Sequence, residues 1–60
     1  MNDQERKWLD NASRYGGSFV QHFAFACFQA DDSNFSMLRP ILDSMMQKYP
    51  AYSVERTVNA

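Results

Sequence analysis

Hydrophobic side chains recur at α-helical spacing in three successive stretches of the chain. In the first stretch, residues 3–15, the apolar residues that share one stripe are Trp8, Leu9, Ala12 and Tyr15. Lys7, Asn11 and Arg14 are expected on the solvent side. Asn2 or Asp3 is suited to cap the start, and acidic residues near the first turn interact favourably with the positive end of the helix dipole. The pattern therefore predicts an amphipathic helix.

The second stretch, residues 18–30, predicts a helix with one broad apolar side and a smaller polar side. The expected apolar side consists of Phe19, Val20, Phe23, Ala24, Ala26, Cys27 and Ala30, and the polar side consists of Gln21, His22 and Gln29. Phe25 projects among the polar residues, with Phe28 at their edge. Because full burial of a phenylalanine is worth about 1.5–3 kcal/mol, we expect another surface to cover these two rings.

The glycine pair between these stretches has two interpretations. Gly16 can end the first helix in the left-handed conformation, and Ser18 can cap the second. Alternatively, the amides of Gly16, Gly17 and Ser18 bind an anion together with Arg14. The lysine of a Walker loop and the strand and third glycine of a dinucleotide fingerprint are missing, which favours the simple turn.

The third stretch predicts a helix over residues 33–48, capped by Asp32 or Ser33. Its apolar residues are Phe35, Leu38, Ile41, Leu42, Met45, Met46 and Tyr49. Pro40 is expected to kink this helix or to break it, and Pro50 to terminate it. The sequence thus predicts an all-α fold with one domain over residues 1–50. Residues 51–60 are expected to form an extended tail, with Tyr52 and Val54 packed on the core or on another chain.

Length and composition indicate that the domain needs support from association. A chain of 60 residues buries only about 60% of its unfolded surface, and the single cysteine, Cys27, excludes an internal disulfide. We therefore expect a homo-oligomer or a partner surface. The net charge of −1, with both signs interspersed, argues against nucleic acid as a partner. No signal peptide or membrane-length apolar run is recognisable, so no membrane association and a cytoplasmic location are expected.

Few residues offer catalytic chemistry. His22 is the lone histidine, and it is five residues from Cys27, on a different side of the predicted helix. Cys27 is expected to be a buried hydrophobe, and Asp31 and Asp32 to serve as caps rather than as a metal clasp. Met37, Met45 and Met46 suit either the core or an adaptable protein contact, with the core favoured. The sequence thus predicts neither an enzyme nor a metal or cofactor site.

The segments "RYGGSFV", "ADDSNFSMLRP" and "KYP" together resemble a set of small proteins encoded by tailed phages and prophages. The likeness runs from about Trp8 to Pro50 and carries no catalytic residues. It implies an accessory protein that acts by binding in the cytoplasm of a bacterial host.

The leading hypothesis is a non-catalytic, homo-oligomeric protein that modulates or inhibits a host protein. Its expected interface comprises Gln21, His22, Phe25, Phe28, Gln29 and Met46. One alternative is an oligomeric sponge that sequesters a nucleotide signal through Arg14 and the amides of Gly16, Gly17 and Ser18. The other alternative is a structural component of the virion.

Overall fold

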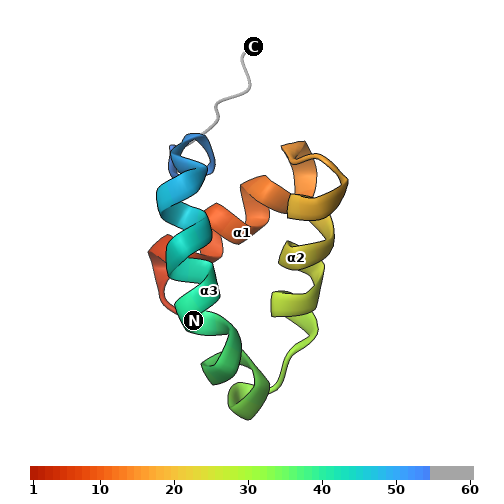
Figure 1. Ribbon diagram of the computed structural model, residues 1–60, viewed down its shortest axis with the longest axis vertical. Helices are drawn as coiled ribbons and strands as arrows, with labels where there is room; N and C mark the ends of the chain where they lie inside the picture. Colours follow the sequence, from red (N-terminus) through yellow and green to blue (C-terminus); the bar gives the residue numbers. More distant parts are fainter. Residues whose placement is uncertain (55–60) are drawn as a thin grey trace.

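The protein folds into three α-helices followed by one turn of 3-10 helix, as predicted for an all-α chain. The computed structural model describes residues 1–54. Its elements are α1 (Asp3–Tyr15), α2 (Ser18–Gln29), α3 (Asp32–Lys48) and η1 (Pro50–Ser53). In Figure 1, α2 and α3 run in opposite directions along the long axis, and α1 crosses obliquely between the α3 side and the α2 side. The most extensive contacts of α1 are with α2 and with η1.

Side chains cap the starts of α1 and α3. The Asn2 carboxamide oxygen accepts a hydrogen bond from the Glu5 amide at 2.8 Å, and the Glu5 carboxylate accepts one from the Asn2 amide at 2.9 Å. This capping box satisfies two backbone donors that the helix itself leaves unpaired. At α3 the cap is Asp31, which accepts from the Asn34 amide at 2.8 Å. The sequence-based choice of Asp32 or Ser33 was wrong by one or two positions, because the helix already begins at Asp32.

The turn between α1 and α2 contains Gly16 in extended geometry, with φ −76° and ψ 161°. The left-handed conformation expected for this glycine was therefore wrong. A Cβ at Gly16 would lie 2.6 Å from the Ala12 carbonyl oxygen and 2.8 Å from Val20 Cγ1, so the close approach of the two helices requires glycine here. Ser18 is the first residue of α2 rather than its cap. The cap residue is Gly17, which has no side chain to accept a hydrogen bond from the helix.

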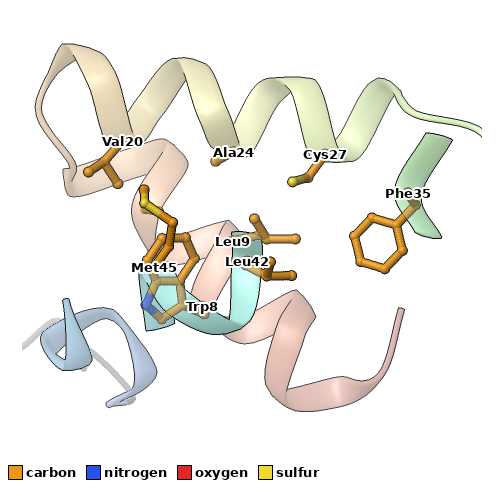
Figure 2. Packing of buried hydrophobic residues seen from close by; sticks show 9 residues of the cluster. Trp8, Leu9, Val20, Ala24, Cys27, Phe35, Leu42 and Met45 are labelled. Atoms are coloured by element: carbon orange, nitrogen blue, oxygen red, sulfur yellow. The ribbon is translucent and has the colours of Figure 1, made fainter. Parts of the chain in front are cut away.

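The core lies where the three helices converge. Figure 2 shows Val20, Ala24 and Cys27 projecting from α2 toward Leu9, Leu42 and Met45. The buried hydrophobic residues are Trp8, Leu9, Ala12, Val20, Ala24, Cys27, Phe35, Leu42 and Met45. Cys27 is thus a buried hydrophobe, as predicted.

Several residues expected on the apolar sides are exposed instead, namely Tyr15, Phe19, Ala26 and Ile41. Of the three methionines expected to favour the core, Met45 is buried, Met46 is half-buried and Met37 is exposed. The stripe of α2 that reaches the core is narrow, with its buried residues at four-residue and three-residue intervals. The exposed apolar residues of α2 and α3 lie on flanks that no described segment covers.

Helix α3 continues through Pro40, so the break considered from the sequence does not occur. Proline lacks the amide that would bond to the carbonyl of the residue four positions earlier, which is Ser36. Both residues are exposed, and water can satisfy that carbonyl on the open side of the helix. Because Pro40 lies outside the core, α3 continues through it without leaving a buried carbonyl unpaired.

The chain after α3 is bound to α1 by Trp8 and Asn11. The Trp8 indole donates to the Tyr49 carbonyl at 2.9 Å, and its ring meets Tyr52 edge-on at a centroid distance of 5.7 Å. The Asn11 amide donates to the carbonyls of Tyr52 and Val54 at 2.9 and 3.1 Å. Asn11 is consequently buried, and its expected place on the solvent side was wrong.

The segment assigned to an extended tail begins with η1, a 3-10 helix. The expectation that Tyr52 packs on the protein's own core is confirmed. The Val54 side chain is exposed, and Val54 is held by its backbone, whose carbonyl accepts from Asn11 and whose amide donates to the Ala51 carbonyl. The remainder of the predicted tail, residues 55–60, lies outside the described residues.

Candidate binding surfaces

The outer face of α2, defined here as His22, Phe25, Phe28 and Gln29, is exposed as the sequence predicted. Phe25 and Phe28 are 44% and 41% exposed. The His22 ring lies edge-on to the Phe25 ring at 6.5 Å, and its Nδ1 is 2.7 Å from the Ser18 carbonyl oxygen. The histidine therefore stands beside Phe25 as a second ring on this face. Helix α2 contains no Asp, Glu, Lys or Arg, so the polar groups of the outer face are the His22 ring and the Gln29 amide.

Two residues of the expected interface lie elsewhere. Gln21 is half-buried and donates from its side chain to the Ser13 carbonyl at 2.8 Å, so it joins α2 to α1. Met46 is half-buried against the core and borders a hollow with Gln4, Lys7 and Ser53. Four of the six expected interface residues thus share the outer face of α2. The other two make contacts within the chain, Gln21 with α1 and Met46 with the core.

A charged hollow adjoins the outer face on the α1 side. Phe28 forms part of its wall, and α1 contributes Asp3, Arg6, Lys7 and Asp10. Two bases, Arg6 and Lys7, lie between two acids, Asp3 and Asp10, so the four charges of this hollow sum to zero. Phe28 therefore borders both the outer face of α2 and this charged hollow.

A second hollow, the α2–α3 groove, is apolar and was not anticipated from the sequence. Its walls are Ala26 and Ala30 of α2 and Met37 and Leu38 of α3, with Gln29 and Asn34 also lining it. Phe19 and Phe23 extend the same flank of α2 at helical spacing, and Ile41 follows Met37 one turn along α3. The spacing of Met37 and Ile41, displaced from the stripe of Phe35, Leu42 and Met45, is the signal that could have separated this flank from the core.

An ion pair between a buried carboxylate and a partly exposed guanidinium joins the start of α1 to the middle of α3. The Glu5 carboxylate accepts two hydrogen bonds from the Arg39 guanidinium, each 2.9 Å long, and its side chain is 6% exposed. The Arg39 side chain is 46% exposed, and its guanidinium carbon lies 4.9 Å from the centre of the Phe35 ring.

The hydrogen bonds from Arg39 are the main reason why the pKa of Glu5 is lowered. Burial opposes this shift, and the Asn2 amide adds to it. The sequence offered no sign of the pair because its members are 34 positions apart.

Cys27 and His22, the two α2 residues considered for catalysis from the sequence, lie in different environments. Burial raises the pKa of the Cys27 thiol, which disfavours the thiolate that a nucleophile needs. Figure 2 shows this side chain pointing toward the core, whereas His22 lies on the outer face. Within residues 1–54, no three His, Cys, Asp or Glu side chains are grouped closely enough to hold a metal ion.

The structure places the members of the proposed anion site at the turn between α1 and α2. The first amides of α2 lie there, but Arg14 is directed back along α1, where its Nε is 3.5 Å from an Asp10 carboxylate oxygen. Both side chains of this pair are well exposed, so the pair is weak. The anion site stays a prediction, and the need for glycine at position 16 is explained by helix packing alone.

Comparison with protein-family models, with curated proteins and with solved structures found no match to this chain. No helix in the described part of the chain combines the length and the apolar character that crossing a membrane requires. The class that the structure defines is thus a small protein of three α-helices.

Proposed function

We propose that this protein is a non-catalytic binding protein that attaches to another protein through the outer face of α2. The observation that carries the proposal is the exposure of Phe25 and Phe28 on a helix that otherwise presents polar side chains there. Covering the exposed part of each ring favours association by about 1 kcal/mol. Aromatic rings flanked by groups that can hydrogen-bond, as His22 and Gln29 can, are typical of the central residues of protein interfaces.

The setting that we propose is the cytoplasm of a bacterial host, with a host protein modulated or inhibited by the bound chain. The resemblance to small phage and prophage proteins supports this setting. Self-association into a homo-oligomer is part of the proposal, because so short a chain encloses a small core. The buried, proton-holding Cys27 and its separation from His22 support binding rather than catalysis.

A photo-cross-linking experiment tests the binding of a second protein. Benzoylphenylalanine replaces Phe25 in the full chain, and a matched variant carries it at Ser36, an exposed position on α3. We expect a discrete adduct with one host protein from position 25 and none from position 36. Phe25→Asp is then expected to weaken copurification of that protein at least about tenfold, because a carboxylate must lose its hydration at an apolar interface.

The proposal is overturned when position 25 gives no adduct beyond those from position 36, or when Phe25→Asp retains the partner fully. Appearance of the chain in purified virions would favour the structural alternative. A large rise in Tm with a single nucleotide would favour the sponge.

A further inference from the structure

The most exposed large hydrophobic side chains of α2 and α3 lie in the α2–α3 groove or on the helix flanks that extend it. Phe19 and Met37 are each 67% exposed and Ile41 is 52% exposed, all more than the Phe25 ring of the outer face. Phe23 and Leu38, which are half-buried, connect these residues to the core. The groove and the flanks that extend it thus form a largely apolar surface on two antiparallel helices, which the described residues do not cover.

The charge of the groove suits a second copy of the same chain. A two-fold interface places one patch against the same patch of another molecule. Any charged residue within the patch therefore faces the same residue of the second copy, or a residue next to it. The residues that line the α2–α3 groove are all uncharged. By contrast, the hollow between α1 and α2 is lined by two acidic and two basic residues, whose charges a two-fold contact would have to desolvate or match.

The shape of the groove is also complementary to itself. Ala26 and Ala30 are one turn apart and form a low strip on α2, whereas Met37 and Ile41 are one turn apart and form a raised strip on α3. Rows of residues spaced by four positions are the ridges and grooves through which helices commonly pack. When α2 of each molecule lies on α3 of the other, each raised strip meets a low one, and the contact occurs twice.

The area available is sufficient for a weak dimer. An aromatic side chain covers about 150–250 Å², so Phe19, Met37 and Ile41 together offer roughly 300 Å² of exposed area per copy. Ala26, Ala30 and the two polar residues at the edge enlarge this area. The three large side chains thus give roughly 600 Å² over two copies, and even with these neighbours the contact stays below the roughly 1,200 Å² of stable specific interfaces, as expected of a weak dimer.

We propose that a second copy of this chain covers the α2–α3 groove and forms a two-fold dimer with Phe19, Met37 and Ile41 at its interface. The inference rests on the self-association included in the proposed function. It is separate from the binding of a second protein, because His22, Phe25 and Phe28 of the outer face do not line the groove, and Gln29 is the member of that face that borders it.

Sedimentation equilibrium of the full chain from about 1 to 300 µM tests the dimer, since an interface this small gives a micromolar Kd. The wild type is expected to change from one to two copies over this range. Met37→Lys and Ile41→Lys are each expected to raise the Kd at least about tenfold, because the ammonium must lose its hydration in the interface. Phe25→Lys and Gln47→Lys, at exposed positions away from the groove, serve as matched controls and should leave the Kd unchanged.

A dilution series of NMR spectra on the wild type gives an answer that needs no variant. The amides of Phe19, Ala26, Ala30, Met37 and Ile41 are expected to shift with concentration, while those of His22 and Phe25 stay constant.

Two results would contradict the inference. A wild type that stays monomeric over the whole concentration range overturns the dimer. Chemical-shift changes on the outer face, or a raised Kd in Phe25→Lys, overturn the assignment of the interface to the groove. A monomer that still forms the Phe25 cross-link contradicts this inference alone, whereas a groove dimer without the cross-link contradicts only the proposed partner binding.

Discussion

Glu5 and Arg39 lie 34 positions apart in the chain and are joined by two parallel hydrogen bonds of 2.9 Å. Glu5 belongs to the capping box of α1, and Arg39 lies against the Phe35 ring on α3. The Glu5 carboxylate therefore both caps the start of α1 and joins α1 to α3. Bidentate arginine–carboxylate pairs are strong hydrogen-bonded contacts, and removal of one partner leaves the other charge uncompensated.

Replacing Arg39 with methionine tests this relationship. The variant leaves the buried Glu5 carboxylate without its partner while it keeps an apolar stem over Phe35. We expect Tm to fall by about 5–10 °C, measured by circular dichroism at pH 7. Arg14→Met is the control, because the exposed pair of Arg14 with Asp10 contributes little, and its Tm should change by less than about 2 °C. Equal changes in the two variants would refute the structural role of Arg39.

The same pair predicts how stability depends on pH. Because Arg39 lowers the pKa of Glu5 in the folded protein, the ion pair contributes its full stability above the unfolded pKa of about 4.5. That contribution is lost as the pH falls below this value and through the folded pKa. Between pH 5 and pH 3, Tm of the wild type should therefore fall more steeply than Tm of Glu5→Gln, which has no carboxylate at this site. Parallel curves for the two proteins would argue against the lowered pKa.

The glycine pair offers an internally controlled substitution. In Gly16→Ala the new methyl group collides with the Ala12 carbonyl and with Val20, so we expect a loss of about 1–3 kcal/mol in the free energy of unfolding. In Gly17→Ala the new methyl group meets no atom within 4 Å. Alanine is a poorer helix cap than glycine, but it also lowers the conformational entropy of the unfolded chain, and the two effects oppose each other. The net effect of Gly17→Ala should stay within about 0.5 kcal/mol. Urea unfolding measures both, and a tolerated Gly16→Ala would contradict the close helix approach.

The Asn11 amide is expected to hold η1 against α1. Asn11→Asp places a carboxylate against the carbonyls of Tyr52 and Val54, and we expect a loss of about 2–3 kcal/mol at pH 7. Trp8 is the single tryptophan, so release of Tyr52 from its ring should shift the fluorescence maximum to longer wavelength. Tyr52→Phe keeps the ring contact and should leave the spectrum close to that of the wild type. An unshifted spectrum in Asn11→Asp would show that η1 is held by other contacts.

Local signals in the sequence were sufficient to place the helices. The stripe of Trp8, Leu9 and Ala12 predicted α1, and Asn2 was one of the two expected caps. The exposure of Phe25 was also predictable, because its polar neighbours one turn away identify the side of the helix on which it lies. These features depend on periodicity and on hydrogen bonds that span a few residues, and both can be read along the chain.

Tertiary structure decided which apolar flanks are covered and which polar residues are buried. Phe19 and Ile41 carry the same local signal as core residues, but no described segment lies against their flanks. Asn11 and Glu5 are polar and still buried, because their partners come from η1 and α3. The sequence by itself determined the helices and the residues that share each face. Only the packing of distant segments decided which faces meet, because helical periodicity orders side chains around one axis and carries no information about what lies beside it.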